Sequence, residues 1–254
     1  MLNIQRLNMD NTWWLNWGDT SLLLDPWLTG SEVDGFRWFN EQWHNTPSVP
    51  PGKVPGYDFV IVTQPYSDHC HTPTLRELNT EKPIWAVPAA LKRIKNEMPV
   101  TKGYNIPATT DVWADIGELR LARITPNRWI DPIYHAIVIA KKEQAVVYAP
   151  HGFMLSPAQA ASISHLNIKL LITTFTEFTL PFFLGGLINP GKEAAIKLMK
   201  QLNAEHMVNT HDEDKRAKGI VIKLAKRKYP DMALLSSTEA GVVNITDYKP
   251  VTFS

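Results

Sequence analysis

Residues 57–71 read YDFVIVTQPYSDHCH, and this stretch joins an apolar run directly to a cluster of polar and ionisable side chains. The apolar run FVIV has the length and composition of a β-strand that is buried on both faces. Asp68, His69 and His71 come directly after it, and Cys70 lies among them. Carboxylate, imidazole and thiolate groups are the side chains that bind transition metals. The stretch therefore predicts a buried strand whose C-terminal end delivers possible metal ligands.

Strand and helix signals alternate along the rest of the chain. Apolar runs of strand length predict strands in 12–28 (a hairpin around Gly18-Asp19), 57–63, 83–88, 111–117, 118–125, 135–142, 145–150, 168–175, 206–211 and 240–245. Other stretches predict helices in 72–81, 89–98, 156–166, 189–203 and 219–229, with Thr72, Ser156 and Asn189 at three of the starts. Strands in blocks, with helices between and after them, favour a layered α/β or α+β fold. No repeat or long linker divides the sequence, so we expect a single domain over residues 1–254.

The charge balance argues against one class of function. Lys and Arg total 26 against 25 Asp and Glu, and no basic stripe runs along the sequence, so we expect no nucleic-acid partner. The most basic segment, KLAKRKYP at 223–230, is short and helix-like, and we expect it to form a solvated helix face. The expected partner is a small-molecule substrate.

Cysteine content and hydropathy bear on location. The single cysteine, Cys70, excludes an internal disulfide, which fits a reducing compartment, and we expect a cytoplasmic protein. The N-terminal residues lack the basic flank and apolar core of a signal peptide, and no apolar run reaches the roughly 18 residues of a membrane span. The longest apolar stretch, 170–188, is interrupted by Glu177 and Pro181. It predicts a buried strand and an apolar loop, which either packs in the core or forms a wall that faces a substrate.

Other polar residues also follow predicted strands. His151 follows one buried strand, His211 follows a later short strand, and Arg128 and His135 lie between two others. Ligands at strand ends are held by a rigid scaffold, which suits a catalytic metal. The remaining histidines are expected to be structural or on the surface: His44, His165 and His206.

The order of these elements and motifs resembles the metallo-β-lactamase superfamily, and the resemblance covers nearly the whole chain. It is greatest to the branch that contains L-ascorbate-6-phosphate lactonase and N-acyl-phosphatidylethanolamine phospholipase D. SLLLDPWLTG at 21–30 is similar to the turn that ends the family's first hairpin, and VTQPYSDHCH at 62–71 aligns with its signature Thr-His-x-His-x-Asp-His. Thr63, Asp68 and His69 match that signature. The resemblance implies a four-layer αββα sandwich.

The departures from the family pattern fall on one side of its two-metal site. In the family, two signature histidines and one histidine after a Pro-Ala dipeptide hold the first metal. These positions carry Gln64, Tyr66 and Arg128 here. The first site of the family pattern is therefore lost as a whole.

The positions that hold the family's second metal are retained. The signature supplies Asp68 and His69, and NAEHMVNTHD supplies the final histidine, His211. VVYAPHGF places His151 where the family has an Asp that bridges the two metals. The resemblance thus implies a mononuclear site of Asp68, His69, His151 and His211, while Arg128 would repel a cation from the first position. One carboxylate and three imidazoles suit zinc, with iron or manganese as alternatives.

This site predicts a metal-dependent hydrolase in which an activated water attacks an ester, lactone or phosphodiester centre. Asp68 is a candidate proton acceptor as well as a ligand. Arg128 is expected either to act as an electrophile toward an anionic substrate oxygen or to form a structural ion pair. Tyr66 either donates a hydrogen bond to the developing oxyanion or packs over the cleft.

Two other hypotheses stay open. In the first, the fold persists without catalysis, and the cleft of a decayed site binds a ligand or a partner. In the second, the protein is an iron-dependent redox protein, although redox members of the family usually keep the full ligand set. Cys70, His71 and His135 are further candidates for the site, and a buried apolar role is the alternative for Cys70.

Overall fold

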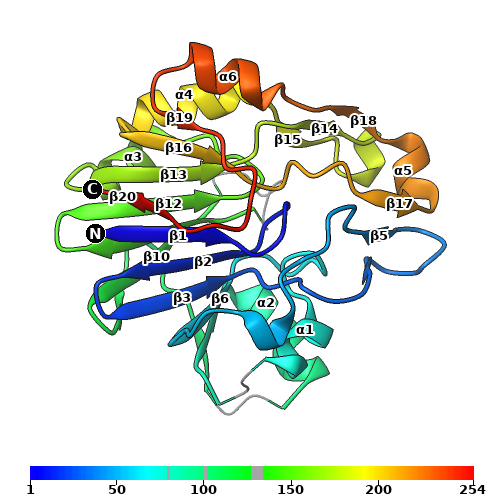
Figure 1. The fold of residues 1–254 in the computed structure, drawn as a ribbon, viewed down its shortest axis with the longest axis horizontal. Coiled ribbons are helices and arrows are strands. Elements are labelled where there is room, and N and C mark those ends of the chain that lie inside the picture. Colours follow the sequence, from blue (N-terminus) through cyan, green and yellow to red (C-terminus); the bar gives the residue numbers. More distant parts are fainter. Residues whose placement is uncertain (79–80, 100–101, 127–133) are drawn as a thin grey trace.

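The computed structural model describes residues 1–78, 81–99, 102–126 and 134–254, and two seven-stranded sheets dominate it (Figure 1). The first sheet has the order β20-β1-β2-β3-β6-β7-β8. Its strands are β1 (Leu2–Arg6), β2 (Trp13–Trp17), β3 (Thr20–Leu24), β6 (Phe59–Val62), β7 (Ile84–Ala86), β8 (Gly103–Asn105) and β20 (Val251–Phe253). The second sheet has the order β19-β16-β13-β12-β11-β10-β9. Its strands are β9 (Ala114–Ile116), β10 (Leu119–Ile124), β11 (Ala136–Lys141), β12 (Gln144–Ala149), β13 (Asn167–Thr173), β16 (His206–Asn209) and β19 (Val242–Val243).

Each sheet combines antiparallel hairpins with parallel strands. The predicted hairpin forms between β2 and β3, and β3 then pairs in parallel with β6. In the second sheet β10, β11 and β12 form an antiparallel meander, and β12, β13 and β16 run parallel. The parallel strands end at one edge of the sheet, on the right of Figure 1. The loops that follow them therefore leave from the same edge.

Helices cover the outer faces of the two sheets. α1 (Thr72–Glu77) and α2 (Pro88–Glu97) pack beside the first sheet, and α3 (Pro157–Ile163), α4 (Lys192–Leu202) and α6 (Met232–Thr238) beside the second. One apolar cluster fills the space between the sheets and continues under α2, and a second lies between the second sheet and its helices. The predicted four-layer αββα sandwich is thus confirmed. None of the helices in the described ranges has the length and hydrophobicity needed to span a membrane.

Strand β11 shows why its sequence is continuously apolar. Ile137 and Ile139 belong to the core between the sheets, whereas Ala136, Val138 and Ala140 belong to the core under the helices. Successive side chains of a strand point to opposite faces. Since both faces are covered here, the sequence carries no polar alternation.

Smaller elements extend from the edge where the parallel strands end (Figure 1). One three-stranded sheet joins β14 (Glu177–Thr179), β15 (Leu187–Pro190) and β18 (Lys226–Lys228), and another joins β4 (Glu32–Val33), β5 (Glu41–Trp43) and β17 (Arg216–Lys218). The short helices are η1 (Pro51–Lys53), η2 (Phe182–Leu184) and α5 (Ile220–Leu224). The predicted helix over 219–229 is wrong beyond Leu224, because Lys226–Lys228 pair with β14 as a strand. Tertiary pairing overrides local helix propensity in this segment.

Two of the three predicted helix starts need correction. Ser156 caps α3 through a capping box, as predicted. His71 rather than Thr72 caps α1, since its side chain accepts a hydrogen bond from Thr74 N. The cap of α4 is Gly191, not Asn189. Asn189 instead lies in β15, and its side chain contributes to the site described next.

Candidate metal centre

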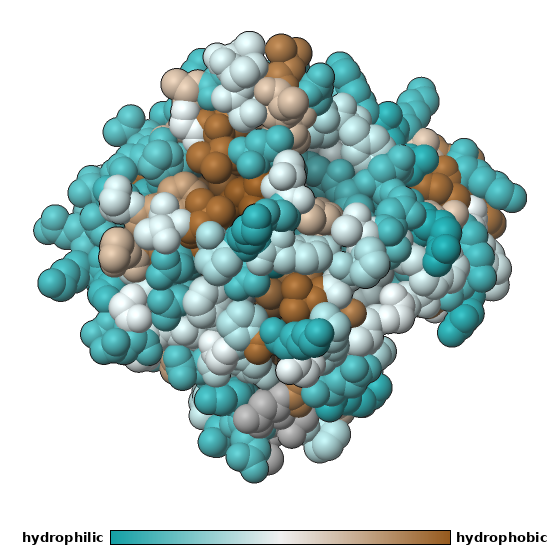
Figure 2. Space-filling view, in the orientation of Figure 1, coloured by the Kyte–Doolittle hydropathy of each residue, from teal (hydrophilic) through white to brown (hydrophobic). Residues whose placement is uncertain are grey.

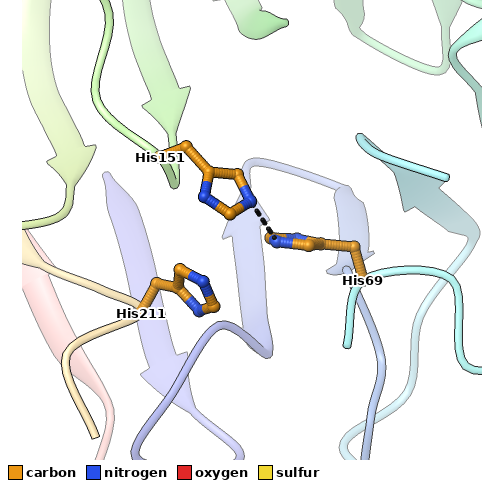
Figure 3. Close-up of side chains that lie close together, drawn as sticks. All are labelled: His69, His151 and His211. Atoms are coloured by element: carbon orange, nitrogen blue, oxygen red, sulfur yellow. Dashed lines mark hydrogen bonds between the residues drawn. The ribbon is translucent and has the colours of Figure 1, made fainter. Parts of the chain in front are cut away.

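Three histidines from three strand ends meet at one point (Figure 3), and Asp68 lies beside two of them. Asp68 and His69 follow β6, His151 follows β12, and His211 follows β16. His69 Nε2 lies 3.0 Å from His151 Nε2, and Asp68 Oδ2 lies 3.7 Å from His69 Nε2 and 3.5 Å from His211 Nε2. The ligand atoms of the three histidines all lie within 4.8 Å of one another. The structure thus brings together all four predicted ligands.

These separations fit one tetrahedral cation. Zinc binds imidazole nitrogen or carboxylate oxygen at about 2.0–2.2 Å, so its tetrahedral ligand atoms are about 3.4 Å from each other. The three measured separations, 3.0, 3.5 and 3.7 Å, lie on either side of that value. The ligand atoms fall into two groups that share His211: the three histidines form one, and Asp68 and Asp10 join His211 in the other.

The outer nitrogens of two of these imidazoles are fixed by hydrogen bonds. His69 Nδ1 lies 2.7 Å from Asp25 Oδ2, and His151 Nδ1 lies 2.8 Å from Asn189 Oδ1. Both partners are oxygen acceptors, so each Nδ1 carries the proton that it donates. With these Nδ1 protons in place, each ring directs its Nε2 toward the centre, and that is the nitrogen that would bind a metal ion once it is unprotonated.

The lone pairs on the Nε2 atoms of His69 and His151 repel each other at 3.0 Å unless a cation lies between them. In the metal-free protein a proton fills this role. Burial acts to lower the pKa of His69, but the carboxylates of Asp68 and Asp25 outweigh it and raise that pKa to about 9. Burial, together with the charges of His211 and His69, holds the pKa of His151 well below its usual value. His69 is therefore the donor and His151 the acceptor, and a metal ion can replace the shared proton.

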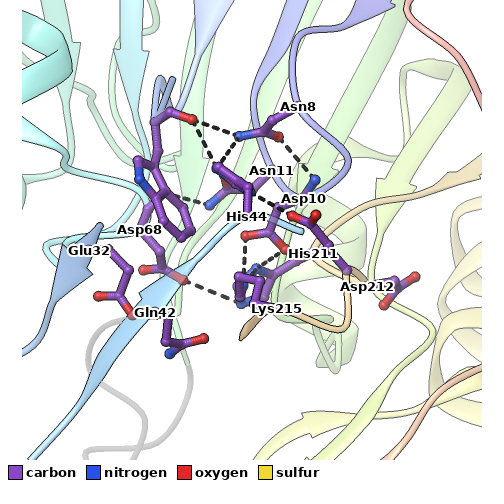
Figure 4. Close-up of polar contacts among 12 residues, drawn as sticks. Asn8, Asp10, Asn11, Glu32, Gln42, His44, Asp68, His211, Asp212 and Lys215 are labelled. Carbon is purple, nitrogen blue, oxygen red and sulfur yellow. Dashed lines mark hydrogen bonds and ion pairs between the residues drawn. The ribbon is translucent and has the colours of Figure 1, made fainter. Parts of the chain in front are cut away.

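His211 is oriented by a buried ion pair (Figure 4). Its Nδ1 lies 3.1 Å from Asp10 Oδ1, and Lys215 Nζ donates to Asp10 Oδ2 at 2.7 Å. Burial acts to raise the pKa of Asp10, but Lys215 and His211 hold it well below its ordinary value. The pKa of Asp68 is lowered to about 2, because the charges of His69 and His211 outweigh the effect of burial. Both carboxylates are therefore ionised beside the imidazoles.

The backbone is strained at two of these positions. Asp25 has a φ of 42° and His211 a φ of 57°, a left-handed conformation that residues with a side chain seldom adopt. Asp25 is held there by Thr63, whose backbone N and side-chain Oγ1 donate to its two carboxylate oxygens at 2.7 and 2.6 Å. Such strain costs on the order of 1–3 kcal/mol and persists where surrounding contacts fix the residue.

The former first-site positions have other contacts. Gln64 is buried, and its Nε2 donates to the carbonyl of His135 at 3.0 Å. Tyr66 packs against Tyr134 with ring centroids 6.0 Å apart, and burial raises the pKa of its phenol. Arg128 lies outside the described residues, so its predicted role stays a prediction. Among the described residues, no first-site position presents an imidazole.

Three further candidates from the sequence have other surroundings. Cys70 is buried in the core between the sheets, and burial raises the pKa of its thiol to about 12. His71 caps α1, and its Nε2 lies 3.2 Å from the carbonyl of Ser31. His135 is largely buried, and burial lowers its pKa to about 4. Within the described ranges, none of the three belongs to a group of ligand atoms that could hold a metal.

A group of acidic side chains lies beside Asp68 (Figure 4). The hydroxyl of Ser67 is within hydrogen-bond distance of Glu32 and of Asp34, the latter at 2.8 Å. Burial, followed by the charges of Asp34 and Asp68, raises the pKa of Glu32 well above its usual value. These surroundings favour the neutral form of Glu32, whereas Asp68 is held in its ionised form.

The centre opens into a cavity of about 230 Å³. Asp68, His151 and His211 lie on its wall together with Tyr66 and Lys215. Apolar side chains form much of the remaining wall: Phe39, Phe178, Leu180, Leu184, Ile188, Val221 and Ile222. Several of these come from the apolar stretch 170–188, so that stretch forms a cavity wall as well as core.

No sequence motif identifies the residues that orient the imidazoles. Asp25 stood in the quoted SLLLDPWLTG turn, but its contact with His69 joins segments 44 residues apart. Asp10 reaches His211 across 201 residues of sequence, and Asn189 had been expected at a helix start. These hydrogen-bond partners of the histidines can be recognised only from the three-dimensional packing of the two sheets.

The family of the chain follows from comparison with known proteins. A family model described as "Beta-lactamase superfamily domain" matches residues 7–211. The chain belongs to this superfamily. No curated protein sequence matches the chain.

Solved structures of the superfamily share the fold over the whole chain. A possible metal-dependent hydrolase from Veillonella parvula aligns with a TM-score of 0.71 and 14% identity, covering 100% of this chain and 99% of its own. An isothiocyanate hydrolase from Delia radicum gut bacteria aligns with a TM-score of 0.67 and 16% identity over the same shares. The metallo-β-lactamase fold protein YhfI from Bacillus subtilis aligns with a TM-score of 0.62 and 15% identity, covering 98% of both chains. At these identities the likeness establishes the fold alone.

Proposed function

We propose that this protein is a hydrolase that depends on one divalent metal ion, zinc, bound by Asp68, His69, His151 and His211. The observation that carries the proposal is the 3.0 Å distance between the Nε2 atoms of His69 and His151. The Nδ1 atom of each ring is hydrogen-bonded to an oxygen acceptor, which fixes the orientation of the ring. A proton shared between the rings can hold this arrangement, and a bound metal ion would take the place of that proton. The expected branch, that of ascorbate-6-phosphate lactonase and N-acyl-phosphatidylethanolamine phospholipase D, remains part of this proposal.

The ion would supply an activated water for attack on an ester, lactone or phosphodiester bond. Asp68, with a pKa of about 2, is ionised and can accept a proton as well as bind the metal. Tyr66 lines the cavity and keeps its proton because burial raises its pKa, so its hydroxyl can donate to a substrate oxygen. Lys215 adds a positive charge that favours an anionic product. The apolar wall favours a substrate with a hydrophobic portion.

Metal content is the first test. Protein purified without chelators and supplied with zinc, iron or manganese should hold about one equivalent of metal by elemental analysis. A His69→Ala/His211→Ala variant should lose it, whereas His165→Ala, which changes an exposed histidine away from the centre, should keep it. Two equivalents would contradict the mononuclear proposal.

Activity is the second test. The metal-loaded protein should hydrolyse at least one member of a panel of aryl esters, lactones and phosphodiesters, and Tyr66→Phe should reduce kcat roughly 10- to 100-fold without changing metal content. A protein that binds metal but turns over none of these classes would refute the hydrolase proposal in this form.

A non-catalytic role is the competing proposal. It is favoured by the first-site positions, because Gln64 donates to a backbone carbonyl and the ring of Tyr66 packs at a tilt against Tyr134. A protein that binds no metal under replete conditions, yet binds an apolar ligand in the cavity, would support this alternative.

A further inference from the structure

Exposed aromatic and aliphatic side chains surround the mouth of the cavity. Phe182 and Phe183, at the tip between β14 and β15, are 91% and 78% exposed. Phe36 and Trp38, in the loop between β4 and β5, are 66% and 63% exposed and stack at 5.7 Å. Exposed apolar groups that gather in one place mark interaction sites on soluble domains, whereas single ones need no explanation.

These groups belong to segments that are bonded to one another. α5 joins the Phe36–Trp38 loop because Ile220 N and Val221 N donate to the carbonyls of Trp38 and Phe39 at 3.2 and 3.0 Å. The strand that follows α5, β18, pairs with β14 at the base of the Phe182 tip. Each segment also sends residues inward to the cavity, among them Phe39, Leu184 and Val221. The exposed groups therefore form one rim around the opening.

The same rim carries a dense positive charge. Residues 215–229 contain seven Lys and Arg residues and no Asp or Glu, although the whole chain has a net charge of only +1. Arg216, Lys218, Lys223, Lys226, Arg227 and Lys228 are all exposed. Lys223 and Lys226 make no ion pair with any described residue. Their charge is thus available to an external anionic partner.

Figure 2 shows hydrophobic atoms at the right-hand edge of the molecule, set among hydrophilic ones, where Figure 1 draws α5 and the β14–β15 tip. Aromatic side chains beside lysines are the composition of a surface that enters the interface of an anionic bilayer. Two copies of this chain related by a two-fold axis would bring two basic segments together, which disfavours a self-interface.

We propose that this rim docks on an anionic lipid surface, with the apolar side chains in the interface and the lysines on the lipid headgroups. The cavity mouth then faces the bilayer, so that hydrophobic ligands can enter without crossing water. Docking uses no residue of the metal centre and stands or falls separately from the hydrolase proposal.

Vesicle co-sedimentation of the full-length chain tests the docking. The protein should sediment with vesicles of phosphatidylcholine mixed with phosphatidylglycerol, and far less with phosphatidylcholine alone. Phe182→Ser/Phe183→Ser and Lys223→Glu/Lys226→Glu should each weaken binding by about tenfold or more. High salt should weaken binding as well, since it screens the headgroup charge.

Matched controls lie outside the rim. Val112→Ser changes a side chain that is 91% exposed but contributes nothing to the cavity, and Lys92→Glu/Lys95→Glu reverses two charges on α2. Both should bind like the wild type, and circular dichroism should show that all variants fold. No sedimentation with either vesicle, or equal sedimentation of rim and control variants, would overturn the proposal. A Phe182-dependent dimer in light scattering without vesicle binding would also overturn it and assign the rim to a second copy.

Discussion

The half of the cleft that retains the ligand types of the family pattern and the half that departs from it differ in the contacts that hold each side chain. On the retained half, every imidazole has an acceptor at its outer nitrogen: Asp25 for His69, Asn189 for His151 and Asp10 for His211. On the altered half, Gln64 donates to the backbone carbonyl of His135, and Tyr66 packs at a tilt against the ring of Tyr134. A metal site consists of its ligands and of the groups that fix them.

This difference argues against general decay of the cleft. A buried, charged pair such as Asp10 and Lys215 is costly to maintain unless it is well paired. Here Asp10 is fully buried, Lys215 is partly buried on the cavity wall, and Asp10 contacts His211. Replacement of metal-ligating residues in only one half of the cleft is the pattern expected of a site that binds one metal ion instead of two.

The largest effect is expected at Asp25. Asp25→Asn removes the charge that fixes His69 and weakens the contacts with Thr63, so zinc affinity should fall by about 100-fold. Competition with a chromophoric chelator measures this affinity. Asp58→Asn is the matched control, because Asp58 accepts from Ser21 N at a distance from the centre. Equal losses in both variants would show that the effect is global rather than local.

Much of the fold, and the meeting of the four candidate ligands, could be predicted from sequence, for a physical reason. Buried strands are continuous apolar runs, and His151 and His211 are the polar residues at the ends of such runs. The orienting residues could not be predicted in this way. Asp10 lies in a turn after β1 and meets His211 only through packing of the two sheets.

The segment 219–229 was mispredicted for a related reason. Its local pattern favours a helix, but the backbone of Lys226–Lys228 pairs with β14, which is about 50 residues distant in sequence. This pairing is what places the basic side chains on the cavity rim. A single domain and a cytoplasmic location stay predictions.

A smaller effect is expected at Asn189. Asn189→Ala leaves His151 Nδ1 without its acceptor at 2.8 Å, so the ring can adopt the wrong tautomer, and zinc affinity should fall by about tenfold. The same chelator competition measures this change, with Asn96→Ala on the exposed face of α2 as the control. An unchanged zinc affinity would mean that the hydrogen bond from His151 to Asn189 does not help to orient His151 for metal binding.

Restoring two histidines of the family pattern tests directly whether the supporting contacts, rather than the ligands alone, distinguish the two halves of the cleft. A Gln64→His/Tyr66→His variant regains two imidazoles, but neither has an acceptor positioned at its outer nitrogen, and His151 replaces the bridging carboxylate. We expect the metal-to-protein ratio to stay near one by elemental analysis. A ratio of two would show that ligand identity alone had determined the loss, and that the supporting contacts matter little.

The smallest expected effect concerns His135, whose carbonyl holds Gln64. Burial lowers its pKa from about 6.5 to about 4, so the folded protein keeps this side chain neutral where the unfolded chain takes up a proton. Its contribution to the free energy of unfolding is therefore complete above pH 6.5 and is lost as the pH falls toward 4. Between pH 7 and pH 5 the loss should be roughly 1 kcal/mol after allowance for partial exposure. Urea unfolding at the two pH values should show a loss that is roughly 1 kcal/mol larger in the wild type and in His165→Gln than in His135→Gln. If His135→Gln keeps the full pH dependence of the free energy of unfolding, the altered half of the cleft is less well buried than the retained half. The two halves would then differ in the types of metal ligand that they present.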